Sequence, residues 1–132
     1  VIHTRAAADD TLRIMREEQA GEAGGVMHCF TESLEVAEAA IEQGFYISFS
    51  GIVTFKNAVA LREVAAAIPL ERMLIETDSP YLAPAPHRGQ TNQPGYVKHV
   101  AEEIARVRGI TTEAVGEITT QNFFRLFASA RH

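Results

Sequence analysis

The sequence has a single cysteine, no long apolar run and fewer basic than acidic side chains. With no second cysteine, Cys29 cannot form an internal disulfide bond, which fits a reducing compartment such as the cytoplasm. No apolar segment approaches the roughly 20 residues that a membrane-spanning helix needs, so no membrane partner is expected. The chain also lacks Gly/Ser-rich linkers and short repeats, so its 132 residues form one domain or part of one.

Basic side chains are outnumbered in this sequence. It has 12 lysines and arginines against 17 aspartates and glutamates, which gives a formal net charge of −5. A protein that binds nucleic acid mainly through its phosphates carries positive charge, so the net charge has the wrong sign for that mode of binding. Any chemistry on phosphate must therefore depend on a local source of positive charge.

Short apolar segments alternate with helical patterns. Four of these segments are too short for helices and are rich in β-branched or aromatic residues, which is typical of strands. The predicted strands are Val1–His3, Gly25–Phe30, Phe45–Phe49 and Met73–Glu76. The predicted helices between them are Asp9–Ala20, Leu34–Gln43 and Ala58–Ile68, with Ser33 and Asn57 as N-caps. Because each strand is followed by a helix, the strands are expected to be parallel.

A long loop and two helices complete the pattern. The loop Ser79–Gln93 contains three prolines, and extended connections of this kind usually carry function. Apolar stripes at helical spacing follow it, at Val97–Val107 and at Val115–Phe127. No glycine-rich phosphate loop follows any predicted strand, which favours a closed barrel over an open doubly wound sheet. The predicted fold class is therefore α/β, a parallel (β/α)8 TIM-type barrel, of which four βα units are present.

Three polar side chains lie at the ends of predicted strands. His3 ends the first strand, His28 lies near the end of the second, and Asp78 follows the fourth. In (β/α)8 enzymes the active site is built at this rim, and imidazole and carboxylate groups together suit a divalent ion. A single histidine at a strand end is more often packed or solvent-facing. The spacing alone therefore leaves both a metal site and a structural role open.

Five motifs carry a family resemblance in their order and spacing. They are Val1–Arg5, His28–Phe30, Ile75–Leu82, Arg88–Pro94 and Thr119–Phe127. Over its whole length the sequence resembles the C-terminal half of TatD-family metal-dependent deoxyribonucleases, which belong to the amidohydrolase-like barrel superfamily. The four βα units would then be the last four of the barrel, and residues 1–132 would form a single partial domain.

The resemblance assigns roles to the three polar residues. His3 and His28 would be metal ligands, and Asp78 would be both a ligand and the base that orients or deprotonates the attacking water. The intact site would hold two divalent ions, with Mg²⁺, Mn²⁺ and Zn²⁺ as candidates. The family's remaining ligands, a His-x-His pair and a glutamate, are expected upstream of Val1, since the sequence contains no His-x-His and does not begin with methionine.

Four further residues are candidates for supporting roles. Glu76 is expected to hold a metal ligand or Arg88 in place, or only to form a salt bridge at the strand end. Arg88 could bind a substrate phosphate or pair with Glu76. Tyr81 could stack on a base or cover the barrel mouth. For Asn92 a hydrogen bond that orders the loop is the first choice.

The implied activity is hydrolysis of phosphodiester bonds in DNA. At full length the resemblance implies a cytoplasmic monomer, an exonuclease acting on single strands or 3′ ends, in which metal ions polarise the phosphoryl group and acidify water. This chain alone is expected to be inactive. Another hydrolase of the superfamily, such as an esterase or a deacylase, stays open because fold and metal site do not determine the substrate. A non-catalytic truncated remnant is the remaining alternative.

Overall fold

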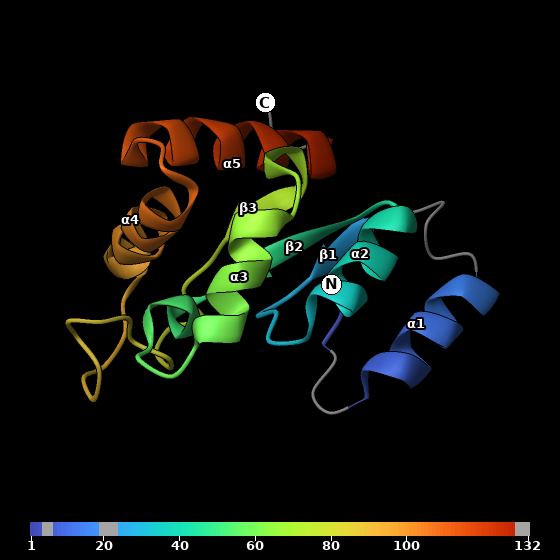
Figure 1. The fold of residues 1–132 in the computed structure, drawn as a ribbon, viewed down its shortest axis with the longest axis horizontal. Helices are drawn as coiled ribbons and strands as arrows, with labels where there is room; N and C mark the ends of the chain where they lie inside the picture. Colours follow the sequence, from blue (N-terminus) through green and yellow to red (C-terminus); the bar gives the residue numbers. More distant parts are fainter. Residues whose placement is uncertain (4–6, 19–23, 129–132) are drawn as a thin grey trace.

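Short parallel strands alternate with helices, and two helices close the chain (Figure 1). The computed structural model describes residues 1–3, 7–18 and 24–128. The helices are α1 (Ala8–Glu17), α2 (Leu34–Glu42), α3 (Val59–Ala67), α4 (Val97–Arg108) and α5 (Thr112–Leu126). The strands are β1 (Gly25–Met27), β2 (Phe45–Phe49) and β3 (Met73–Ile75), and the 3-10 turns are η2 (Gly51–Thr54), η3 (Leu70–Arg72) and η4 (Pro94–Tyr96). Within the described ranges, none of the helices has the length and apolar character that crossing a bilayer requires.

The three strands form one parallel sheet in the order β1-β2-β3. Ile47 of β2 pairs with Met27 on one side and with Met73 on the other. The predicted α/β class with parallel strands is therefore confirmed. The predicted strand Val1–His3 is wrong as a strand, because pairing there is confined to one parallel bridge between Ile2 and Met27.

Two other strands are shorter than predicted. The strand predicted to reach Phe30 ends at Met27, because Cys29 has a φ of 47°, far from the extended region. The strand predicted to include Glu76 ends at Ile75. The polar residues after both strands therefore lie in the connections at the carboxyl end of the sheet.

The predicted helix ends hold in part. Ser33 is the N-cap of α2, and its hydroxyl accepts a backbone N–H at 3.3 Å. The N-cap predicted at Asn57 is wrong, because Ala58 occupies that position without a side-chain hydrogen bond. The end predicted at Ala20 for the first helix lies outside the described residues. Gly109 ends α4 in the left-handed conformation that favours glycine.

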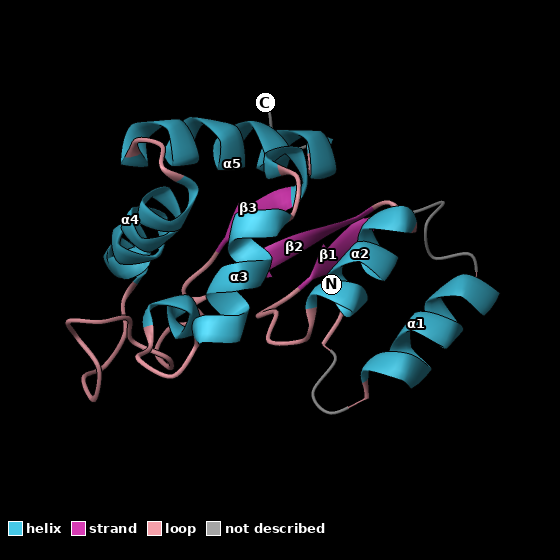
Figure 2. Cartoon of the chain, viewed as in Figure 1, coloured by secondary structure: helices cyan, strands magenta, loops and turns pink. Residues whose placement is uncertain are grey.

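The central strand separates two different environments. All five residues of β2 are buried, and Ile47 and Phe49 belong to the core formed with residues of α2, α3 and α4. Figure 2 shows β2 as the middle strand, between β1 and β3. The opposite face carries Tyr46 with its neighbours on β1 and β3, and meets Leu126 of α5. This second face borders a hollow of about 690 Å³, lined in part by Phe123 and Phe127. It is the face that would point inward in a closed barrel.

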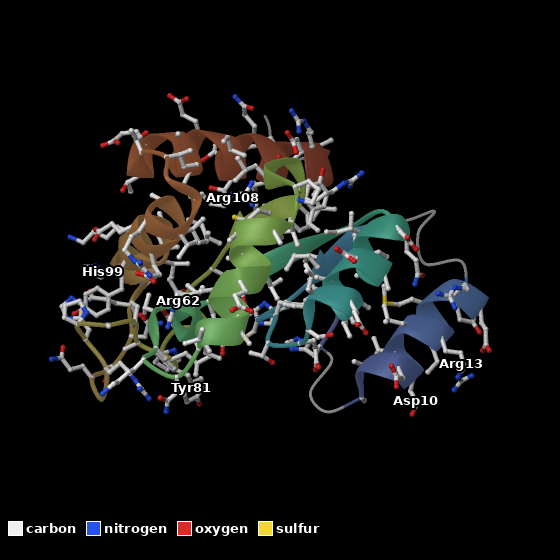
Figure 3. All side chains as sticks on the ribbon, in the orientation of Figure 1. Asp10, Arg13, Arg62, Tyr81, His99 and Arg108 are labelled. Atoms are coloured by element: carbon white, nitrogen blue, oxygen red, sulfur yellow. The ribbon has the colours of Figure 1, made fainter. Side chains whose placement is uncertain are left out.

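Two polar side chains on the last helices bind distant backbone. The Arg108 guanidinium donates to the carbonyls of Ala65, Ala66 and Ile68 at the end of α3, at distances from 2.6 to 3.2 Å (Figure 3). Asn122 is 1% exposed, and its amide donates to the carbonyls of Leu70 and Met73, both at 2.8 Å. Asn122 therefore attaches α5 to the start of β3.

Replacing Asn122 with leucine should destabilise the fold. The carbonyls of Leu70 and Met73 would lose their donor, and we expect a loss of about 1–3 kcal/mol in the free energy of unfolding. Urea denaturation of the full-length protein measures this loss, with Gln121→Leu as a control because Gln121 is the adjacent, exposed amide on α5. Equal denaturation midpoints for the two variants would contradict the role assigned to Asn122.

Candidate metal centre

Polar side chains from three strand ends meet at the carboxyl edge of the sheet. His28 follows β1, Ser48 lies in β2 and Glu76 follows β3. His28 Nδ1 lies 2.6 Å from Glu76 Oε2, and the Ser48 hydroxyl donates to the same oxygen at 2.8 Å. One carboxylate oxygen therefore holds groups from the other two strands.

The three ligands predicted from the sequence lie close together. His28 Nε2 lies 3.3 Å from Asp78 Oδ1. The His3 ring meets the His28 ring edge to face, with 4.6 Å between the ring centres. Glu76 thus holds the imidazole of His28 at Nδ1, while Nε2 faces the carboxylate of Asp78.

The Glu76 carboxyl is the electrostatically distinctive group of the site. Burial raises its pKa above the ordinary value, while the hydrogen bond from Ser48 and the positive charge that His28 can carry act in the opposite direction. Within the described residues, its second oxygen, Oε1, is buried without a hydrogen-bond partner. Glu76, Ser48 and His28 all line the hollow beside α5.

The donor atoms fit a divalent ion as part of a ligand set. Two ligands of one ion at about 2.0–2.2 Å lie roughly 3.0–3.5 Å from each other, and His28 Nε2 and Asp78 Oδ1 are 3.3 Å apart. Nitrogen and carboxylate oxygen donors suit Zn²⁺ or Mn²⁺. Within the described ranges, no group of three or more His, Cys, Asp or Glu side chains has the arrangement of a metal site. A complete site therefore needs further ligands.

The loop that carries Asp78 is ordered by a buried amide. Asn92 is 3% exposed and donates to the carbonyls of Thr77 at 2.7 Å and Tyr81 at 2.8 Å. Its side-chain oxygen accepts the N–H of Gln93 at 2.9 Å. The predicted loop-ordering hydrogen bonds of Asn92 are therefore present, on both sides of Asp78.

The same loop packs closely on η2. A side chain at Gly51 would collide with the carbonyl oxygen of Leu82, so only glycine permits this approach. Thr54 Oγ1 accepts the N–H of Ala85 at 2.8 Å. These contacts hold the loop above the end of β2.

The remaining candidates lie in this loop. The guanidinium of Arg88 stacks on the Phe55 ring at 3.9 Å, while Glu76 is bound by His28 and Ser48. The alternative in which Arg88 pairs with Glu76 is therefore wrong. Tyr81 is 70% exposed and extends outward from the loop (Figure 3). Contacts of Arg88 or Tyr81 with a substrate stay predictions.

Two contributors to the site were missed from the sequence, Ser48 and Phe55. Ser48 is a polar residue inside an otherwise apolar strand, and it lies on the same face as Tyr46. That break in an apolar run was the available signal. Phe55 offered no comparable signal, because its contact with Arg88 joins segments that are far apart in the sequence.

A parallel sheet with imidazole and carboxylate groups at the carboxyl ends of its strands is typical of the TIM-type barrels, a class of proteins whose active sites lie at that rim. Two solved structures have this chain's fold. A TatD homolog from Escherichia coli K12, YJJV, matches 94% of this chain and 48% of its own chain, with a TM-score of 0.87 and 27% identity. A TatD-family hydrolase from Entamoeba histolytica, at 20% identity, shows the fold alone, with a TM-score of 0.83.

The chain belongs to the TatD family, since the sequence model described as "TatD related DNase" matches residues 1–128. Two curated relatives are each named an uncharacterized metal-dependent hydrolase. YcfH of Escherichia coli K12 is 57% identical and YabD of Bacillus subtilis 168 is 52% identical, each over 127 residues. These alignments cover 96% of this chain but 48% and 50% of the relatives. The chain thus spans about half the length of its relatives.

Proposed function

We propose that a protein of the relatives' length that contains this chain hydrolyses phosphodiester bonds in DNA with the help of divalent metal ions. The observation that carries the proposal is the convergence of His28 Nε2 and Asp78 Oδ1, 3.3 Å apart, beside the ring of His3. The description of the matching family as a DNase supports DNA as the substrate class. His3, His28 and Asp78 would supply part of the ligand set for two ions.

Each residue of the site has a separate task in this proposal. When bound, divalent ions supply positive charge to a phosphoryl oxygen and lower the pKa of water toward neutrality. The Glu76 carboxylate accepts a hydrogen bond from the Nδ1–H of His28, which leaves the lone pair on Nε2 free for a ligand bond. The Asp78 carboxylate orients the attacking water and accepts its proton.

Substrate contacts are assigned to the long loop. Arg88 would bind a phosphate, because its guanidinium lies over the Phe55 ring, with 3.9 Å between Cζ and the ring centre, and a guanidinium is well matched to phosphate oxygens. Tyr81, exposed at the loop surface, would stack on a base. The bound ions would provide the positive charge that the net charge of −5 does not. The reaction proposed is exonuclease action on single strands or 3′ ends by a cytoplasmic monomer.

Removal of metal should abolish the activity of the full-length protein. The direct test measures release of nucleotides from single-stranded DNA with EDTA and after addition of Mg²⁺, Mn²⁺ or Zn²⁺, alongside hydrolysis of small carboxylic esters. We expect DNA cleavage that is lost with EDTA and restored by metal. Turnover of the esters without DNA cleavage would replace the proposal with an esterase or deacylase activity. Metal-independent cleavage of DNA would contradict it.

A further inference from the structure

A hydrogen-bonded chain links the three strand ends at the metal centre. It starts at the Ser48 hydroxyl, passes through Glu76 Oε2 at 2.8 Å, and reaches His28 Nδ1 at a further 2.6 Å. The other nitrogen of His28 faces Asp78 at 3.3 Å. Ser48, Glu76 and His28 each belong to a different strand or connection. The geometry at His28 therefore depends on contacts across the sheet.

In this series of hydrogen bonds, Ser48 is the residue whose backbone is paired within the sheet. It lies in the central strand, is 3% exposed, and pairs in register with Leu74 of β3. Its carbonyl accepts the N–H of Phe30 at 2.9 Å, which ties it to the segment just after His28. The backbone on both sides of the Ser48 hydroxyl is therefore fixed by the sheet.

Glu76 depends on Ser48 for its orientation. Its Oε2 has two hydrogen-bonding neighbours, Ser48 and His28, whereas Oε1 has none among the described residues. Without the Ser48 hydroxyl, Oε2 would keep only its contact with the ring of His28, and the backbone N–H of Cys29 would be the other group that holds the carboxylate, which could then rotate. A ligand histidine is normally oriented by a carboxylate at its second nitrogen, and that carboxylate is itself held by a hydrogen bond.

We propose that Ser48 is a positioning residue for the metal centre, which acts through Glu76 to fix the ring orientation and the tautomer of His28. The inference rests on the proposed function only in taking His28 as a metal ligand. A purely structural serine would satisfy a buried carboxylate without affecting the imidazole. The two roles differ in what happens at His28 when the hydroxyl is removed.

The test compares Ser48→Ala, Ser48→Thr and Ser50→Ala in the full-length protein. Threonine keeps the hydroxyl and suits a strand. Ser50 is a matched control, because it is fully buried near the end of the same strand, but its hydroxyl contacts Cys29 and the N–H of Ile52 instead of Glu76. The readouts are the ¹⁵N NMR shifts of the His28 imidazole in the metal-free protein and the dissociation constant for Zn²⁺.

In Ser48→Ala we expect loss of the single Nδ1-protonated form of His28 and a Zn²⁺ dissociation constant raised about tenfold, the lower end of the range for residues that support a ligand. Ser48→Thr and Ser50→Ala should keep both wild-type values. Unchanged values in Ser48→Ala would overturn the proposal. A His28 that is protonated at Nε2 instead of Nδ1 in the wild-type protein would overturn it as well. That measurement does not depend on the folding of any variant.

These readouts separate this inference from the proposed function. If the tautomer and the Zn²⁺ affinity respond as expected but no DNA is cleaved, the proposed function fails and the positioning role stands. If DNA is cleaved with metal while Ser48→Ala keeps the wild-type tautomer and Zn²⁺ affinity, the positioning role fails and the proposed function stands.

Discussion

Replacing Asp78 with asparagine is expected to lower kcat for DNA hydrolysis by about 10²–10⁴-fold, the range for loss of a general base. Asparagine has the shape of aspartate but no negative charge, and its amide cannot accept the proton of water. The carboxylate is 35% exposed, and its backbone stays held by the loop, so the fold should survive. Steady-state kinetics on single-stranded DNA at saturating metal, with circular dichroism as a check of folding, measure the effect.

The matched control is Asp9→Asn. Asp9 is an exposed aspartate in the first turn of α1, outside the metal centre, and the same change of charge there should leave kcat unaffected. A folded Asp78→Asn protein with wild-type turnover would show that this carboxylate neither binds the metal nor moves the proton. An equal loss in both variants would instead indicate an effect of net charge.

The second large effect is expected for Asn92→Leu. Leucine has a similar volume, but it would leave the carbonyls of Thr77 and Tyr81 and the N–H of Gln93 without their partner. Losing three hydrogen bonds should lower the free energy of unfolding by roughly 2–4 kcal/mol. Because these groups flank Asp78, kcat should fall as well.

Gln90→Leu provides the comparison for Asn92. Gln90 is an exposed amide in the same loop, so its replacement should change neither stability nor kcat. Urea denaturation and DNA hydrolysis, measured on both variants at full length, test the two effects separately. Wild-type stability in Asn92→Leu would mean that the loop holds its shape without the three hydrogen bonds.

The strand positions followed from simple patterns, but the strand ends did not. Phe45–Phe49 is a short, apolar and aromatic run, and the strand occupies those residues. The end of β1 depends on the positive φ of Cys29, a conformation that residues other than glycine rarely adopt. No local pattern in the sequence predicts this turn at Cys29, because the contacts that hold it come from other strands.

The site could be predicted in outline for a geometric reason. Parallel strands share one carboxyl edge, so residues that follow different strands, such as His28 and Asp78, meet there whatever the detailed register. The contacts of Ser48 and Arg88 depend on register and loop conformation. Both are set by packing between distant segments, which explains why Ser48 and Phe55 were not identified from the sequence as partners of Glu76 and Arg88.

The most direct test of the metal centre is a crystal structure of the full-length protein with Mn²⁺, in which anomalous scattering locates the ion. The account predicts an ion bonded to His28 Nε2 and to a carboxylate oxygen of Asp78, with His28 Nδ1 still bound to Glu76. An ion bound elsewhere, or a site in which His28 keeps its contact with Asp78 and takes no metal, would contradict the central claim.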